Sequence, residues 1–203
     1  MNEVLSAWDY IFKSQSQVSV YPFSDLVSLV HRYCGSLPQG ARVLELGCGF
    51  GPNVCIFKNL GYDYTGIEGT STATSVASKL HPDAKLIQAD FTFPLPFRNH
   101  NFHLICDRSA ITHNKNHVEF IFSEIYRLLA PEGLFIGVDY FSNEHYISQQ
   151  LEENDERYQS CLFCDDEQIR RLLHKFEILT LRLKMVDEII PKQRRLAFFD
   201  FVA

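Results

Sequence analysis

Residues 43–53 read Val43-Leu44-Glu45-Leu46-Gly47-Cys48-Gly49-Phe50-Gly51-Pro52-Asn53, an apolar segment that runs into a glycine-dense turn. The segment 41–46 predicts a short buried strand, and the apolar spacing after Pro52 predicts a helix. Glycines at alternate positions remove the Cβ atoms from one side of the turn, so that the backbone can lie against a ligand. A strand, a glycine turn and a helix N-terminus in this order indicate a site for a nucleotide-like cofactor in an open α/β sheet.

Two common nucleotide-binding motifs do not fit this turn. The dinucleotide fingerprint requires Gly-x-Gly-x-x-Gly or Ala, and its last small position is Pro52 here. Proline suits the first position of a helix, because its missing N–H would have had no partner there. No Gly-Lys-Ser/Thr follows the turn, which excludes a P-loop. A dehydrogenase is therefore disfavoured.

The next predicted strand, 62–67, ends in an acidic residue. Glu68 follows this strand, and a carboxylate in that position can accept hydrogen bonds from both hydroxyls of a ribose. The same charge would repel a 2′-phosphate. Thr70 or Ser71 is expected to cap the helix that runs to about Leu80.

The glycine run resembles motif I of the class I S-adenosylmethionine-dependent methyltransferases. In that family an acidic residue after the second strand holds the ribose, which Glu68 matches. A carboxylate after the third strand, here 84–88, faces the adenine amine, and its neighbour covers the ring; Asp90 and Phe91 match these positions. The resemblance implies S-adenosyl-L-methionine as cofactor and S-adenosyl-L-homocysteine as product. The expected cofactor-binding residues are Glu45, Gly47, Cys48, Gly49, Gly51, Asn53, Glu68, Gly69, Thr70, Asp90, Phe91, Asp107 and Arg108.

The rest of the chain alternates between predicted strands and helices. Further strands are expected at 102–106 and 134–138, followed by two β-rich stretches at 176–185 and 195–202. Helices are expected at 24–34, 53–60, 71–80, 117–129 and 165–174. The resemblance implies a Rossmann-like α/β three-layer sandwich, with a seven-stranded, mostly parallel sheet in the order 3-2-1-4-5-7-6 and the last strand antiparallel. Residues 1–38 would be a helical, aromatic extension and residues 39–203 the methyltransferase domain.

Residues 93–105 resemble a run found in small-molecule methyltransferases, with His103 where aspartate is usual. The loop after the fourth strand, 107–114, carries an acid, a base of suitable pKa and several hydrogen-bonding groups. His113 and Asp107 are the expected catalytic residues. His113 is predicted as general base or for positioning the acceptor, the alternative being an exposed loop histidine. Asp107 is predicted to approach the methionine end of the cofactor.

The first 23 residues are rich in aromatic side chains. In small enzymes of the resembling family such a segment folds over the cofactor as a lid, where flat apolar groups exclude water. The alternative is that the aromatic residues only attach the extension to the core. The expected substrate-binding residues are Trp8, Tyr10, Tyr21, His113 and Tyr140.

Composition narrows the class of partner. The chain has 203 residues, is 46% hydrophobic and carries a net charge of −6, which disfavours a nucleic acid as main partner. It has no apolar run long enough to span a membrane and no basic leader, so we expect a cytoplasmic protein.

The cysteines, expected to be reduced thiols, are Cys34, Cys48, Cys55, Cys106, Cys161 and Cys164. Cys161 and Cys164 have chelate spacing, but no second pair completes a zinc site, and no metal is predicted.

The sequence therefore predicts a cytoplasmic methyltransferase that acts on oxygen or nitrogen of a small molecule. The Asp-Pro-Pro-Tyr quartet of nucleobase amino-methylation is absent, which disfavours DNA. Two alternatives stay open. One is a protein or RNA methyltransferase recruited through a partner, and the other is a non-catalytic module with the same fold. The identity of the acceptor and the oligomeric state are not determined by the sequence.

Overall fold

The strands form one sheet in a computed structural model that describes residues 3–14, 19–146, 160–190 and 194–203. The sheet has seven strands in the order β3-β2-β1-β4-β5-β7-β6. Their bounds are Arg42–Leu46 (β1), Asp63–Glu68 (β2), Lys85–Gln88 (β3), Phe102–Arg108 (β4), Leu129–Phe141 (β5), Thr180–Glu188 (β6) and Arg194–Val202 (β7). Strands β1 to β5 pair in parallel, whereas β7 is antiparallel to both β5 and β6. The predicted strand order and the antiparallel last strand are confirmed.

Every helix expected from the apolar periodicity is present. The bounds of the α-helices are Glu3–Lys13 (α1), Ser24–Tyr33 (α2), Val54–Asn59 (α3), Ser71–Leu80 (α4), Val118–Leu128 (α5) and Asp166–Leu172 (α8). Two 3₁₀ turns, Ile111–His113 (η1) and Lys115–His117 (η2), lie between β4 and α5. Thr70 caps α4 by accepting a hydrogen bond from the N–H of Ala73 at 3.4 Å.

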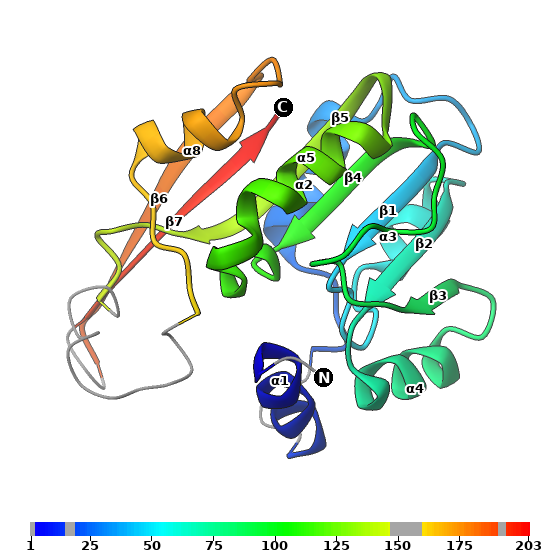
Figure 1. The fold of residues 1–203 in the computed structure, drawn as a ribbon, viewed down its shortest axis with the longest axis horizontal. Coiled ribbons are helices and arrows are strands. Elements are labelled where there is room, and N and C mark those ends of the chain that lie inside the picture. Colours follow the sequence, from blue (N-terminus) through cyan, green and yellow to red (C-terminus); the bar gives the residue numbers. More distant parts are fainter. Residues whose placement is uncertain (1–2, 15–18, 147–159, 191–193) are drawn as a thin grey trace.

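Alternation along the strands divides the core into two layers. In β1, Val43 packs with α2 and α3, whereas Leu44 and Leu46 pack on the opposite face with α5. Figure 1 shows α5 in front of the sheet and α2 behind it. This is the predicted three-layer sandwich. The helix α2, which falls in the predicted extension, contributes Leu26 and Leu29 to the same buried cluster as Val43.

Strand β5 is longer than the predicted 134–138. Its first residue, Leu129, pairs with Phe102, and the register then shifts before Leu104. At its other end, antiparallel pairing with β7 continues to Phe141. Pairing partners that are distant in the sequence thus set both ends of this strand. The apolar periodicity of β5 alone does not predict where these partners begin and end.

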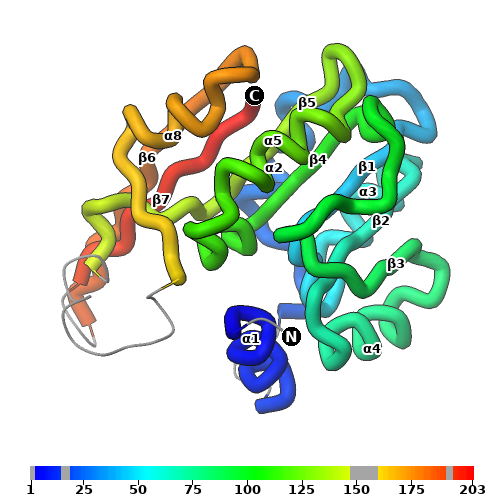
Figure 2. The backbone as a smooth tube through the Cα atoms, viewed as in Figure 1, coloured from blue at the N-terminus to red at the C-terminus, as the bar shows by residue number. Residues whose placement is uncertain are grey.

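Helix α1 lies beyond the carboxyl ends of the parallel strands, next to α4 (Figures 1 and 2). Asp9 is its one buried residue, and its Oδ1 accepts a hydrogen bond from the N–H of Thr72 at 3.2 Å. Lys13 pairs with the other oxygen of Asp9 at 2.7 Å. The hydrogen bond from Thr72 fixes α1 at the first turn of α4, and Lys13 within α1 balances the charge of Asp9.

We predict that Gly137→Ala destabilises the sheet. A Cβ at this buried position of β5 would lie 2.2 Å from Cζ of Phe201, so the ring would have to move. Overpacking of this kind costs about 1–3 kcal/mol of unfolding free energy. Urea titration followed by circular dichroism measures the change. The matched control is Gly35→Ala, because nothing lies within 4 Å of a Cβ there; equal stability of the two variants would contradict the packing argument.

Candidate functional site

The glycine turn between β1 and α3 depends on the absence of side chains. Gly47, Gly49 and Gly51 have φ angles of 66°, 54° and 78°, in the left-handed region that favours glycine. A Cβ on Gly47 would lie 2.2 Å from Cβ of Ala110, and one on Gly51 would lie 2.8 Å from Cδ2 of His81. The turn therefore packs closely between the loop after β4 and the end of α4.

Glu45 braces this turn from inside the core. Its Oε1 accepts a hydrogen bond from Nδ2 of Asn53 at 2.7 Å, and its Oε2 accepts one from the hydroxyl of Tyr64 at 2.5 Å. Asn53 in turn accepts a hydrogen bond from the N–H of Phe23 at 3.1 Å. Burial raises the pKa of Glu45 to about 7. Glu45 and Asn53, both expected at the cofactor, thus have protein partners for their side chains.

Cys48 is placed in a similar way. Its side chain is buried, and its Sγ would lie 2.8 Å from a Cβ on Gly66 in β2. The backbone N–H of Cys48 donates to the carbonyl of Ile67 at 3.0 Å. The thiol therefore packs on the neighbouring strand.

Glu68 lies directly against the glycine turn. Its Oε2 accepts a hydrogen bond from the N–H of Gly49 at 3.0 Å. Its Oε1 accepts two hydrogen bonds from Thr70, one from the N–H and one from the hydroxyl, both at 2.8 Å. Burial raises the pKa of Glu68, and these hydrogen bonds oppose the rise. The structure thus brings together three of the predicted cofactor residues: Gly49 of the turn after β1, Glu68 at the end of β2 and Thr70 at the start of α4.

Asp90 and Phe91 lie on the third side of the turn. Asp90 Oδ1 accepts hydrogen bonds from the N–H and hydroxyl of Thr92 at 3.0 and 2.7 Å, which closes the loop after β3. Phe91 is buried, and its Cε1 would lie 3.9 Å from a Cβ on Gly47. The predicted adenine pair is therefore next to the glycine turn, with the Phe91 ring beside Gly47.

Asp107 holds the loop after β4 in place. The residue has no exposed surface, and its Oδ1 accepts hydrogen bonds from the N–H groups of Ala110 and Ile111 at 3.0 and 3.2 Å. Burial raises its pKa to about 7. Asp107 Oδ2 has no partner of ordinary hydrogen-bond geometry within the described residues. In this arrangement Asp107 shapes the turn into η1, and its approach to the cofactor stays a prediction.

Arg108 is engaged by a charge network next to this loop. Its guanidinium pairs with Asp139 at 2.6 Å and lies over the ring of Phe23, 3.8 Å from the centroid. Lys184 joins the network through Asp139 at 2.7 Å and Asp25 at 2.6 Å. The network connects α2, β4, β5 and β6. The charge of Arg108 is thus balanced within the protein.

His113 lies in an apolar, largely aromatic environment. Its ring makes edge contacts with Trp8 and Phe141, at centroid distances of 5.0 and 5.8 Å. Its Nδ1 is 3.2 Å from Sγ of Cys161. Burial lowers the pKa of His113 to about 4, so the imidazole is neutral at pH 7 and a weak base. Of the two expected roles, these surroundings favour positioning of the acceptor over general base.

Tyr140, which is predicted to bind the substrate, lies in the core. It has no exposed surface and packs in the core against Phe201 and Phe122, at centroid distances of 5.0 and 6.4 Å. Side chains alternate along a strand, so that Tyr140 and its neighbour Phe141 face opposite sides of β5. Phe141, which is not among the residues predicted from the sequence, lies next to His113.

Tyr10 and Tyr21, also predicted to bind the substrate, lie at the surface. They are 74% and 79% exposed, so most of each side chain faces solvent. Helical periodicity explains Tyr10, because Asp9 is the buried residue of α1 and Tyr10 follows it around the helix. Trp8, by contrast, lies against the ring of His113.

The inner face of α1 covers the glycine site. Leu5 lies over Gly69, where a Cβ would come within 2.3 Å of Leu5 Cδ2. Phe12 lies 3.7 Å from a Cβ position on Gly49, and its ring packs on Phe50 at 5.0 Å. Together with Trp8, these residues recur at helical spacing on one face. The aromatic residues of this segment are visible in the sequence, whereas Leu5 carries no chemical signal that would predict its place over Gly69.

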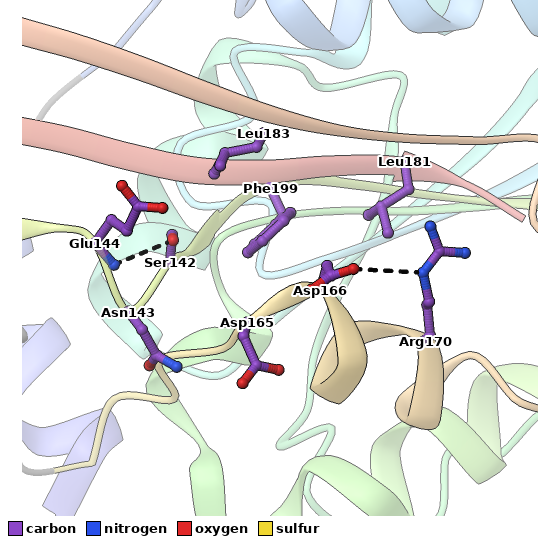
Figure 3. Close-up of a pocket in the computed structure, with 9 residues that line it drawn as sticks. All are labelled: Ser142, Asn143, Glu144, Asp165, Asp166, Arg170, Leu181, Leu183 and Phe199. Atoms are coloured by element: carbon purple, nitrogen blue, oxygen red, sulfur yellow. Dashed lines mark hydrogen bonds and ion pairs between the residues drawn. The ribbon is translucent and has the colours of Figure 1, made fainter.

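A separate pocket lies away from the glycine site, between the end of β5, α8 and the β6–β7 hairpin (Figure 3). Its volume is about 290 Å³. Apolar side chains of the hairpin line one side and acidic side chains near α8 the other. None of the residues predicted to bind cofactor or acceptor lines it. Among the described residues, no cluster of three or more metal-ligating side chains occurs, and no helix has the length and apolar content to cross a membrane.

The strand order and the glycine site together define the class I methyltransferase fold. Residues 44–137 match the family described as "Methyltransferase domain". A sterol 24-C-methyltransferase from Pneumocystis carinii is 30% identical over 132 residues, which are 62% of this chain and 33% of that protein. A SAM-dependent methyltransferase structure from Anabaena variabilis has a TM-score of 0.74 at 15% identity, covering 100% of this chain and 95% of that one. One from Methanosarcina mazei has a TM-score of 0.70 at 19% identity, covering 91% and 97%.

The chain has the fold of the class I S-adenosylmethionine-dependent methyltransferases, and its residues 44–137 match the methyltransferase domain family. It covers about a third of the length of the curated relatives that it matches. The solved structures, all below 25% identity, share its fold.

We predict that Glu45→Gln flattens the dependence of stability on pH. The folded pKa of Glu45 is raised from 4.5 to about 7, so its contribution to stability is full below pH 4.5 and is lost as the pH rises through 7. The loss is on the order of 1 kcal/mol for each pKa unit. Urea titrations at pH 4.5, 6 and 7.5 should show a smaller decline in the variant. Glu119→Gln, at an exposed position of α5, is the control; an unchanged decline in Glu45→Gln would refute the burial argument.

Proposed function

We propose that this protein transfers a methyl group from S-adenosylmethionine to a small-molecule acceptor. The observation that carries the proposal is the carboxylate of Glu68, held at the carboxyl end of β2 against the N–H of Gly49. The residues around it fit this cofactor. The turn has left-handed glycines, Glu68 offers oxygen acceptors, and Phe91 offers an aromatic face beside Gly47. When bound, the cofactor supplies a methyl group on a positively charged sulfur.

The residues of the chain would share the work of binding. Glu68 would accept hydrogen bonds from the ribose hydroxyls, and Asp90 one from the adenine amine, with Phe91 along the ring. Helix α1 would act as the lid, since Leu5 and Phe12 already lie over the loop glycines. A covered site excludes water, which protects the reacting groups and strengthens polar contacts within it.

The acceptor would bind between α1, η1 and the end of β5. Trp8, His113 and Phe141 bring their rings together there, which favours an acceptor with a flat or apolar body. A neutral His113 would orient the acceptor by a hydrogen bond. The Pneumocystis relative is named for methylation at carbon, so carbon joins oxygen and nitrogen as possible reacting atoms. We further propose a cytoplasmic location, because no disulfide forms among the described residues.

We predict that Glu68→Ala weakens the binding of S-adenosylhomocysteine. Loss of hydrogen bonds to a charged group costs about 1.5–3 kcal/mol, or roughly ten- to a hundredfold in the dissociation constant. Isothermal titration calorimetry measures it, with NADH as the control ligand. The matched control is Asp63→Asn, at the opposite, exposed end of the same strand. Failure of the wild type to bind S-adenosylhomocysteine, or a preference for NADH, would refute the proposed function.

We predict that Phe12→Ala weakens the same binding, because it uncovers the loop at Gly49. Tyr10→Ala, on the exposed side of α1, should leave it unchanged. The chain has a single tryptophan, Trp8, so its emission reports on this helix during the titration. A lid that closes on ligand should change Trp8 emission. Identical affinities for both variants, with no change in emission, would favour a helix that is only attached to the core.

A further inference from the structure

The histidine of the proposed acceptor site has a partner that the proposed function does not use. Sγ of Cys161 lies 3.2 Å from Nδ1 of His113, and Cys161 is buried. In the sequence, Cys161 and Cys164 stand at chelate spacing. Within the described residues, however, no group of metal-ligating side chains gathers around either of them. The contact between Cys161 and His113 therefore calls for an explanation other than a metal.

The backbone holds this contact in place from both sides. The N–H of Leu162 donates to the carbonyl of Thr112 at 2.7 Å, and the N–H of Lys115 donates to the carbonyl of Ser160 at 3.0 Å. The residues that flank Cys161 are thus bonded to the loop that carries His113. Backbone pairing on both sides leaves the thiol little freedom to move away from the ring.

The same segment is attached to the end of β5. The N–H of Cys164 donates to the carbonyl of Phe141 at 2.9 Å, and the N–H of Asn143 donates to the carbonyl of Cys164 at 2.9 Å. Phe141 is also the ring in edge contact with His113. Residues 160–164 therefore join the two loops that form the proposed acceptor site.

The surroundings decide which of the two groups carries the shared hydrogen. Trp8 and Phe141 enclose the imidazole with apolar surface, and burial lowers the pKa of His113 to about 4. An ion pair of thiolate and imidazolium is disfavoured there, because burial penalises both charges. Between neutral partners, an imidazole nitrogen is the better acceptor and sulfur is a weak one. The thiol of Cys161 is therefore the donor and Nδ1 the acceptor.

We propose that Cys161 is a positioning residue of this site, whose thiol holds His113 in the tautomer that carries its proton on Nε2. The other ring nitrogen, Nε2, makes no hydrogen bond to any residue that the structure describes. Nε2–H is then a donor available to the methyl acceptor. The inference rests on the proposed function for its purpose, but the tautomer itself is a property of the protein alone.

This arrangement also restricts the class of acceptor. A site that offers one N–H within aromatic walls selects a largely apolar molecule with a lone pair to receive it. A hydroxyl or carbonyl oxygen on an apolar skeleton meets this requirement. A fully protonated amine does not, because it has no lone pair to accept the hydrogen bond.

The tautomer is measured by long-range ¹H–¹⁵N correlation spectra of protein labelled with ¹⁵N-histidine. The signals of His113 are assigned from their loss in His113→Gln. We expect the wild type to show a single Nε2–H tautomer for His113. Cys161→Ala should lose this preference and populate both tautomers, whereas Cys161→Ser, which keeps a donor, should restore it. Cys164→Ala is the matched control, since Cys164 is equally buried and has no contact with the imidazole within the described residues.

Thermal unfolding by circular dichroism establishes that each variant is folded before its spectrum is interpreted. If Cys161→Ala does not fold, the comparison of wild type with Cys161→Ser decides alone, because both must show the Nε2–H form. A wild-type His113 with its proton on Nδ1 would overturn the inference. The same tautomer in Cys161→Ala as in wild type would do so as well.

Calorimetry with S-adenosylhomocysteine separates this inference from the proposed function. Cys161→Ala should bind that ligand as the wild type does, because Cys161 contacts His113 and not the glycine turn. Once an acceptor is known, the same variant should show a lower kcat/KM for it, which Cys161→Ser restores. Absence of S-adenosylhomocysteine binding in the wild type would remove the proposed function and leave the tautomer result standing.

Discussion

The left-handed glycine turn between β1 and α3 is the constraint on which the rest of the site depends. Its backbone leaves no room for a Cβ at Gly47, where Ala110 of the neighbouring loop closes in. Below the turn, buried Glu45 is bonded to Asn53 at the start of the following helix. Above it, Glu68 accepts the N–H of Gly49. Each of these contacts comes from a different strand or loop. The turn is therefore the point at which residues at the ends of β1, β2 and β4 meet.

Buried acids serve this structure in more than one way. Burial raises the pKa of Glu45, Glu68 and Asp107, and each is compensated by hydrogen bonds. The hydrogen bonds of Glu45 hold the glycine turn, and those of Asp107 hold the loop after β4. Glu68 lies at the end of β2, where the N–H groups of Gly49 and Thr70 donate to its carboxylate. Ribose hydroxyls could replace these donors or add further hydrogen bonds to the same oxygens. These roles cannot be told apart from the type of acidic residue or from its position in the sequence. They differ because different neighbours donate hydrogen bonds to each carboxylate.

Packing determines where the residues predicted for the acceptor site lie. His113 and Trp8 meet as rings in edge contact, although they are far apart in the sequence. Tyr140 lies in the core because the register shift of β5 between Gly137 and Tyr140 turns it to the face of Phe135, toward Phe122. Phe141 is the residue of β5 that lies beside His113. Helical periodicity likewise exposes Tyr10 while the same helix presents Leu5 and Phe12 to the glycine turn. Aromatic composition draws attention to these segments, but the face of each strand or helix decides which of their side chains lie near His113 and the glycine turn.

By itself, the sequence determined the fold class, the strand order through the family resemblance, the glycine turn and the acid of β2. These features are local or follow from short motifs, since glycine spacing, apolar periodicity and strand-end acids are all read along the chain. Only the tertiary structure decided which side chains meet. The pairing of Cys161 with His113 depends on backbone hydrogen bonds between segments nearly fifty residues apart. Contacts between distant segments also set the ends of β5 and place α1 over the glycine turn. Such contacts follow no periodic pattern along the chain, so the sequence alone does not predict them.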